Sequence, residues 1–121
     1  MNIQEISNEV VGLLRNGKFD QAQTAYFAQD AVSQEPTSAN IPEVKGLEAI
    51  LQKGEQFRNS VEAWHGITVS DPVVSGHHFA LQLKVDLTFK GQEPSTMDEL
   101  IVYQVVDGKI VKEQFFYLSG T

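Results

Sequence analysis

Two glutamates near the end of the chain, Glu99 and Glu113, are the side chains best suited to acid/base chemistry. They lie in a stretch rich in β-branched and aromatic residues, Thr96 to Leu118, which Asp107-Gly108 divides into two runs. Asp-Gly between such runs indicates a β-hairpin, because glycine tolerates a positive φ and aspartate hydrogen-bonds its own backbone. A carboxyl group held among apolar side chains has a raised pKa and becomes a proton donor near neutral pH.

The length of the hairpin turn decides whether both carboxylates share one face, because a one-residue slip moves a strand's side chains to the other face. A two-residue turn pairs Val106 with Lys109 and leaves one glutamate facing solvent. A three-residue turn, residues 106–108 with a bulge, pairs Val105 with Lys109. We favour the three-residue turn, in which the carboxylates lie diagonally across one apolar face, roughly 7 Å apart. That face would carry Glu99, Ile101, Tyr103, Val105, Val111, Glu113, Phe115 and Tyr117.

His65 is the third candidate for proton transfer. It shares a predicted strand face with Ala63, Ile67 and Val69. An imidazole titrates where acid/base work needs it and could pair with a nearby glutamate. The alternative is a core histidine with one hydrogen bond, which is the commoner role of a lone histidine on an apolar face.

No metal site is expected. His77 and His78 are adjacent and would point to opposite faces of a strand, so they cannot share one ion without distortion. No third ligand follows them at a recognisable spacing.

Aromatic side chains would form the wall of a binding pocket around the carboxylates. A buried tyrosine needs a partner for its hydroxyl group, and a carboxylate in the same pocket would provide one. The predicted wall consists of Tyr26, Trp64, Tyr103, Phe115 and Tyr117.

Apolar spacing of three and four residues predicts three helices in the first half of the chain. They span Asn2–Arg15, Phe19–Ala28 and Gly46–Ser60. In the third, Leu47, Ile50, Leu51 and Phe57 are expected to face inward, with Lys53 and Arg58 on the outer side.

Period-two alternation predicts strands after residue 61. The predicted strands are Glu62–Ser70, Val73–Phe89 with a possible turn at Ser75-Gly76, and the final hairpin. A short strand, Ala31–Glu35, is expected between the helices, followed by an irregular loop with two prolines, residues 36–45.

This order predicts a single α+β domain over residues 1–121. Three N-terminal helices would pack on the concave face of a curved antiparallel sheet, forming a cone with room for a pocket. On the convex face, Gln82, Lys84, Asp86 and Thr88 would form a solvated surface or a polar dimer interface.

Composition narrows the function classes. Nine basic against 16 acidic residues give a net charge of −7. Such a surface repels phosphate backbones and anionic lipid, so neither nucleic acid nor membrane is an expected partner. The absence of cysteine excludes thiol chemistry and disulfides. With no signal-peptide pattern and no transmembrane stretch, a soluble cytoplasmic protein is expected.

The order of YFAQDAVSQEP, a helix that starts at glycine, and DELIVYQVVDGKIVKEQFFY resembles the nuclear-transport-factor-2-like superfamily, and within it the SnoaL-like domains. The resemblance implies the same cone-shaped fold and a homodimer formed through the sheet. The superfamily includes ketosteroid isomerase, polyketide cyclases, limonene epoxide hydrolase, dehydratases and proteins without catalysis, so fold alone does not give function.

The resemblance also suggests which site residues to examine. In ketosteroid isomerase a segment like Asp30–Pro36 carries the proton-moving carboxylate just before proline, which here is Glu35. The oxyanion-hole donors of that family correspond to Val10 and Ile101, so steroid isomerisation by that mechanism is not expected. The arginine of the Asp-Arg-Asp site of limonene epoxide hydrolase corresponds to Met97. The SnoaL cyclases, with a pocket carboxylate and no cofactor, remain the pattern that the chain can meet.

The leading hypothesis is therefore a cofactor-independent acid/base enzyme of isomerase, cyclase or hydratase type, acting on a small apolar molecule. Glu99, Glu113 and His65 would handle protons, with Glu35 near the pocket mouth. The alternative is a non-catalytic ligand-binding or dimerisation module of the same fold. A protein-binding role is the weaker third reading, because the chain shows no dedicated docking patch.

Overall fold

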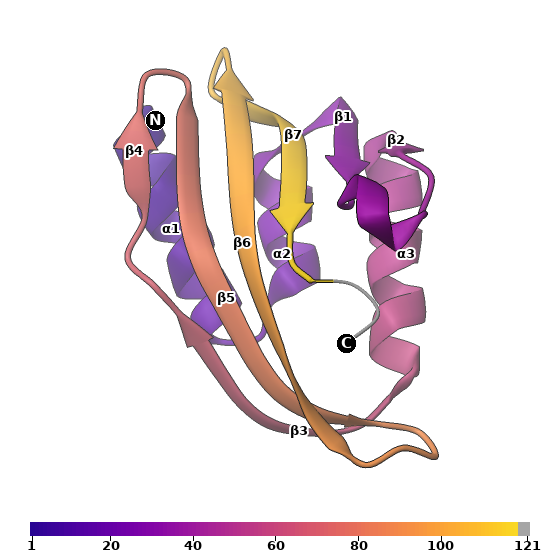
Figure 1. Ribbon diagram of the computed structural model, residues 1–121. Helices are drawn as coiled ribbons and strands as arrows, with labels where there is room; N and C mark the ends of the chain where they lie inside the picture. The colour runs from indigo at the N-terminus through magenta and orange to yellow at the C-terminus, as the bar shows by residue number, and fades with distance from the viewer. Residues whose placement is uncertain (119–121) are drawn as a thin grey trace.

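A computed structural model describes residues 1–118, which form three α-helices, one short 3₁₀ helix and seven β-strands (Figure 1). The helices are α1 (Ile3–Arg15), α2 (Phe19–Tyr26) and α3 (Leu47–Asn59), with the 3₁₀ turn at Thr37–Ala39. The strands are β1 (Phe27–Gln34), β2 (Val44–Lys45), β3 (Val61–Val69), β4 (Val73–Ser75), β5 (His78–Phe89), β6 (Pro94–Val106) and β7 (Lys109–Phe116).

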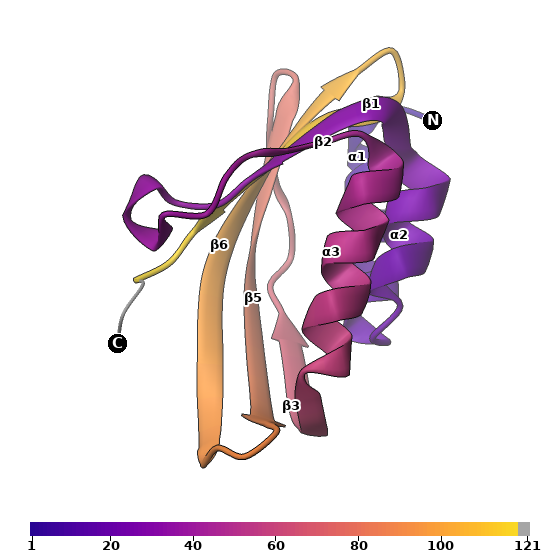
Figure 2. The same ribbon diagram turned by 90° about the vertical axis from the view of Figure 1, so that its right-hand side faces the viewer.

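The strands form one curved sheet in the order β2-β1-β7-β6-β5-β3, with β4 paired to β5. All three helices lie on the same side of this sheet, as Figures 1 and 2 show from two directions. The predicted α+β cone is confirmed. One detail differs, because β1 runs parallel to β7 and makes the sheet mixed.

Helix α1 begins and ends where local chemistry requires. The Asn2 side chain accepts a hydrogen bond from the Glu5 backbone, and the Glu5 carboxylate accepts one from the Asn2 backbone, which completes a capping box. Gly17, with φ of 72°, follows the last turn. None of the helices in residues 1–118 is long and apolar enough to cross a membrane.

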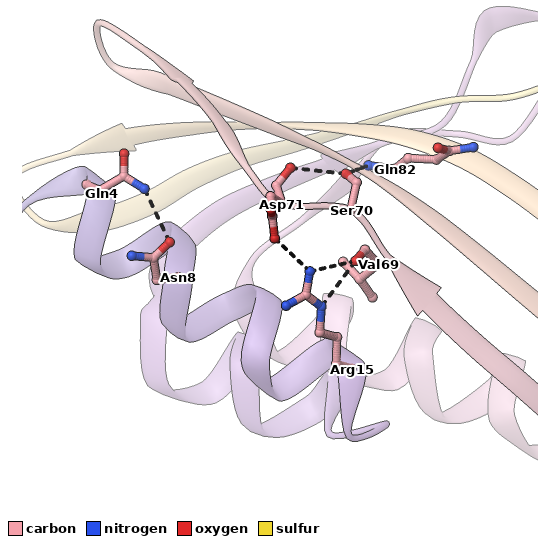
Figure 3. A network of polar contacts seen from close by, with 7 residues as sticks. All are labelled: Gln4, Asn8, Arg15, Val69, Ser70, Asp71 and Gln82. Carbon is pink, nitrogen blue, oxygen red and sulfur yellow. Dashed lines mark hydrogen bonds and ion pairs between the residues drawn. The ribbon is translucent and has the colours of Figure 1, made fainter.

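A polar network fixes the C-terminal end of α1 to the end of β3 (Figure 3). The Arg15 guanidinium donates from Nε and Nη2 to the Val69 carbonyl, at 3.1 and 2.9 Å, and from Nη2 to Asp71 Oδ1 at 3.0 Å. The Ser70 hydroxyl accepts from the Gln82 backbone at 2.8 Å. These bonds hold the helix layer against the sheet on the side away from β1.

The junction between α2 and β1 differs from the prediction. The helix ends at Tyr26 and the strand begins at Phe27, so the expected helix is too long and the expected strand too short. Tertiary packing decides this boundary, because Phe27 is buried and its ring meets that of Tyr103 edge-on at 6.3 Å. The loop at 36–45 also contains β2, which pairs with β1.

The β6–β7 hairpin has the two-residue turn, so the preferred three-residue turn is wrong. Val106 pairs with Lys109, and Asp107 and Gly108 both have positive φ, 51° and 76°. This is the turn whose twist matches that of the flanking strands.

A β-bulge nevertheless returns both glutamates to one face. Val105 pairs with Ile110 and Gln104 with Lys112, which leaves Val111 as an extra residue. The bulge shifts β7 by one residue, so Tyr103 pairs with Glu113. The predicted diagonal placement of the two carboxylates is therefore wrong, because Glu99 lies four residues along β6 from Tyr103 and not two residues from the partner of Glu113. Ile110, and not Val111, therefore faces the core, where its side chain is fully buried.

The inward row of β5 is confirmed. Phe79, Leu81, Leu83, Val85 and Leu87 are buried, and Phe89 packs against them. The possible turn at Ser75-Gly76 is real, since β4 folds back on β5.

Candidate functional site

A cavity of about 160 Å³ lies between the helices and the inner face of the sheet. Its apolar lining comes from α2, α3 and four strands: Phe19, Ile50, Phe57, Trp64, Leu83, Val85, Met97 and Phe115. Its polar lining consists of Gln23, Glu35, Lys53, Arg58, Glu99 and Glu113, and the backbone at Gly54 completes the wall.

Neighbouring strands bring Glu99 and Glu113 into this cavity. Glu99 lies on β6 opposite Leu83, and Glu113 lies on β7 between Tyr103 of β6 and Ser33 of β1. Only 8% of Glu99 and 4% of Glu113 are exposed, so both carboxyl groups are withdrawn from bulk water. The cavity that they line is their route to a reacting molecule.

Ser33 and Lys53 hold Glu113 in a directed chain of hydrogen bonds. Lys53 Nζ donates to Ser33 Oγ at 3.0 Å, and Ser33 Oγ donates to Glu113 Oε1 at 2.8 Å. Since an ammonium group can only donate, the serine proton points to the glutamate. Oε1 of Glu113 is therefore an acceptor, and a proton bound by Glu113 lies on Oε2.

Lys53 also binds Glu35, the carboxylate suggested by the ketosteroid isomerase resemblance. The Lys53 Nζ to Glu35 Oε1 distance is 3.2 Å, and Nζ lies 5.1 Å from the centre of the Phe115 ring. The second oxygen of Glu35 is buried, and no side chain or backbone group among residues 1–118 donates to it. Glu35 thus lines the cavity as a charged neighbour of the two buried glutamates.

Burial raises the pKa of both Glu99 and Glu113 to about 7. For Glu99 the charges of Glu35 and Glu113 raise it further, and Lys53 acts against them. For Glu113 the Ser33 hydrogen bond and Lys53 oppose the effect of burial. The Ser33 hydrogen bond favours the carboxylate form of Glu113, whereas none of the hydrogen bonds within residues 1–118 does the same for Glu99.

The predicted aromatic wall is only partly right in position. Phe115 and Trp64 line the cavity, and Trp64 stands at its edge with 41% exposure, stacked on Phe19. Tyr103 lies in the core, its ring 4.6 Å from that of Phe79. Burial and the charges of Glu113 and Glu99 raise the pKa of Tyr103 well above its usual value.

The other two tyrosines also lie outside the cavity lining. Burial, the charges of Glu35 and Glu99, and a side-chain hydrogen bond with Glu35 raise the pKa of Tyr117 to about 12. Tyr26 packs against the core, and burial together with the charge of Glu9 raises its pKa.

His65 does not face the cavity. The pairing of β3 with β5 shifts between Trp64 and Gly66, which leaves His65 as an extra residue in a bulge. Its Nε2 lies 2.8 Å from Thr88 Oγ1. Thr88 is two residues from the outward-facing Asp86 on β5, so the two side chains start on the same outer face of the sheet. The predicted face is therefore wrong for His65, because the bulge interrupts the alternation on which it depended.

The sequence did not indicate four side chains that line the cavity or hydrogen-bond to its glutamates: Ser33, Lys53, Gln23 and Arg58. Lys53 and Arg58 were placed on the outer side of the helix, but both line the cavity. The spacing Ile50, Lys53, Phe57 is a three-and-four pattern that could have revealed Lys53. Ser33 is two residues before Glu35, so a strand would place both side chains on one face, and this spacing could have revealed Ser33. Among residues 1–118, no three histidine, aspartate or glutamate side chains are grouped so as to hold a metal ion.

Comparison with solved structures identifies close relatives of this architecture. A candidate SnoaL-like polyketide cyclase from Mesorhizobium loti is 38% identical, with 97% of this chain and 100% of that chain covered and a TM-score of 0.90. A Catenulispora acidiphila protein with a ketosteroid isomerase-like fold, solved with trimethylamine, is 18% identical over 95% of this chain and 86% of that chain, with a TM-score of 0.75. A candidate polyketide cyclase from Pseudomonas putida is 14% identical, with 98% and 93% covered and a TM-score of 0.73. The last two likenesses concern the fold alone.

No protein of curated function matches the chain. The family model of the SnoaL-like domain matches residues 1–117, nearly the whole sequence. Together with the 38% identical relative and the cone with its buried carboxylates, this match shows that the chain belongs to the SnoaL-like domain family.

Proposed function

We propose that this protein is a cofactor-independent acid/base enzyme that moves a proton at a carbon next to the carbonyl of a small apolar molecule. The observation that carries the proposal is the pair of buried carboxyl groups, Glu99 and Glu113, whose pKa values are raised to about 7 at an apolar cavity. A general acid and a general base work best when their pKa values lie near the operating pH.

The two carboxyl groups divide the work in one step. Glu113, as carboxylate, takes the proton from the carbon through Oε2, and Glu99, as carboxylic acid, gives its proton to the carbonyl oxygen. The electron pair of the broken C–H bond forms the C=C bond of an enol. Where the substrate has a β,γ double bond, the enol is a conjugated dienol, and return of the proton to the γ-carbon with re-formation of the C=O bond gives the α,β-unsaturated isomer. Where the substrate has a second carbonyl group, attack of the enol α-carbon on it gives an aldol-type ring closure, in which the enol O–H proton is lost and the new alkoxide is protonated.

The lining supports a substrate of one or two rings. The ring centres of Phe19 and Phe57 lie 6.3 and 6.2 Å from that of Trp64 at one side of the cavity, and these rings offer planar contacts to a planar guest. The name of the Mesorhizobium loti relative, a candidate polyketide cyclase, points to the same kind of ring-forming substrate.

Deuterium exchange tests the proton-transfer step without knowledge of the natural substrate. We expect the protein to accelerate exchange of the α-protons of 2-tetralone in D₂O, followed by ¹H NMR. Glu113→Gln and Glu99→Gln keep the shape of each side chain but cannot relay the proton, so each should lose about 10²-fold or more of the rate.

Glu62→Gln is the matched control, because Glu62 is exposed on β3 and lies outside the cavity. It should exchange the ketone at the rate of the unaltered protein. Equal rates in the unaltered protein and in the Glu99→Gln/Glu113→Gln double variant would refute the acid/base role.

A ligand-binding module without catalysis is the competing proposal. The buried oxygens Gln23 Oε1 and Glu35 Oε2 favour a bound guest, since neither accepts a hydrogen bond from residues 1–118. The same variants separate the two proposals, because a binding module keeps its ligand and gains stability when buried charge is removed.

A further inference from the structure

Arg58 is a cationic group at the cavity that pairs with none of the residues 1–118. It lines the cavity from the last turn of α3 and is partly buried. No ion pair or hydrogen bond joins its guanidinium to another described residue, although the chain has 16 acidic side chains. The dipole of α3 favours a positive charge in its last turn, but it does not explain why the Arg58 guanidinium lies at the cavity.

Gly54 leaves the space that the Arg58 guanidinium occupies at the cavity. It lies inside α3, where glycine costs roughly 0.5–1 kcal/mol relative to alanine and where no positive φ requires it. A Cβ at residue 54 would lie 3.0 Å from Arg58 Nη1 and 3.9 Å from Gln23 Oε1. The missing side chain therefore leaves an open point between a guanidinium and an amide oxygen.

Gln23 provides an unused acceptor at the same point. Its Oε1 is buried and receives no hydrogen bond from any described residue. Gln23 is one helical turn from Phe19 on α2, and Gly54 is one turn from Phe57 on α3, so the polar groups adjoin the aromatic side of the cavity. We refer to Gln23, Gly54 and Arg58 together as the Gly54 notch.

We propose that the Gly54 notch binds the carboxylate of a small aromatic hydroxy acid, with Arg58 donating to the carboxylate and Gln23 Oε1 accepting from the neighbouring hydroxyl. Guanidinium and carboxylate form paired, charge-assisted hydrogen bonds. The charge distribution fixes the orientation of such a guest, because the carboxylates of Glu35 and Glu113 repel an anion from the other polar part of the lining. This inference rests on the proposed function for the rest of the molecule, the part that faces Glu99 and Glu113.

Three probes of similar shape separate the contributions. 3-Hydroxy-2-naphthoate carries both groups, 2-naphthoate lacks the hydroxyl, and 3-hydroxy-2-naphthamide lacks the charge. We expect the full chain to bind 3-hydroxy-2-naphthoate about tenfold more tightly than the amide in calorimetric titrations.

Two substitutions assign the contacts. Arg58→Met should weaken both acids about tenfold and leave the amide unchanged. Gln23→Leu should reduce the affinity for 3-hydroxy-2-naphthoate to that for 2-naphthoate. Lys90→Met removes the same charge from an exposed turn outside the cavity and should change none of the three affinities.

Gly54→Ala distinguishes a binding role from a structural one. The new methyl group should displace the flexible Arg58 head and weaken the acids about tenfold, while the better helix former raises Tm by a few degrees. A more stable protein with weaker acid binding supports the proposal. A more stable protein with unchanged affinities overturns it.

Two other results also overturn the proposed binding of a carboxylate at the Gly54 notch. The first is that the unaltered protein binds the acid no more tightly than the amide, or binds neither. The second is that Arg58→Met leaves all the affinities unchanged. The proposed acid/base role is judged separately on 2-tetralone, which has no carboxylate. Failure of the notch leaves that exchange intact, and failure of exchange in the unaltered protein leaves the notch to be decided by binding.

Discussion

At the scale of single residues, the site depends on one serine that donates a hydrogen bond to Glu113 and not to Glu99. Ser33 is fully buried and its only proton is directed to Glu113, because Lys53 donates to the serine oxygen. Among residues 1–118 no donor of this kind reaches Glu99, which lines the same cavity four residues along β6 from the Tyr103–Glu113 pair. Two chemically identical side chains thereby have different surroundings, which is the basis of the different roles proposed for them.

The raised pKa values predict how stability depends on pH. Glu99 and Glu113 titrate at about 7 in the folded protein but near 4.5 when exposed. Between these values the folded chain binds more protons than the unfolded chain, so stability is complete at low pH and is lost as the pH rises through 7. We expect the free energy of unfolding in urea to fall by about 5 kcal/mol between pH 5 and pH 8, half of it from each carboxyl group.

The double variant Glu99→Gln/Glu113→Gln is the control for this pH dependence. Its neutral side chains cannot lose protons, so its stability should stay nearly level over the same interval and exceed that of the unaltered protein at pH 8. The same downward slope in both proteins would contradict the assignment to these two carboxyl groups.

At the scale of elements, the β6–β7 hairpin brings the glutamates together through a tight turn and a bulge. The turn starts the two strands in a register that would separate the carboxylates, and the extra residue Val111 restores the shared face. On the opposite face of the same two strands, away from the helices, Leu100 pairs with Phe116.

The turn itself can be tested by substitution. Gly108 has φ of 76° and nothing lies within 4 Å of the place a Cβ would take, so Gly108→Ala should be destabilising through backbone strain alone. We expect a loss of about 1–2 kcal/mol in urea unfolding. Asp107→Asn keeps a residue that tolerates positive φ and should leave stability almost unchanged. Equal stability of the two variants would show that the turn relaxes to another form.

At the scale of the whole molecule, the helices cover one face of the sheet and leave the other open (Figures 1 and 2). Leu100 and Phe116 lie on the open face with 46% and 43% exposure, side by side across the β6–β7 pair. We propose that two copies of the chain pair through this face, since joining the two apolar patches removes them from water.

Light scattering coupled to gel filtration tests this pairing. The unaltered protein should elute as a dimer, and Leu100→Asp/Phe116→Asp should shift it to the monomer, because buried aspartates have no partner there. Val73→Asp is the control, as Val73 is 70% exposed on β4 at the side of the sheet away from β7. A monomeric unaltered protein at micromolar concentration would exclude the dimer.

The sequence by itself determined the elements and their order, because these follow from local periodicity and turn chemistry. Three helices, the long alternating β5 and the Asp107-Gly108 turn are all readable from neighbouring residues, and so is the family to which they belong. It also identified Glu99, Glu113 and Glu35, which line one cavity.

Only the tertiary structure decided which side chains meet. The bulges at Val111 and His65 reverse the alternation, so one restores Glu113 to the inner face and the other removes His65 from it. The parallel pairing of β1 with β7 places Ser33 beside Glu113, 80 residues away in the chain, and the packing of α3 turns Lys53 and Arg58 inward. Register and packing arise from contacts between distant segments, so no local pattern of residue types encodes them.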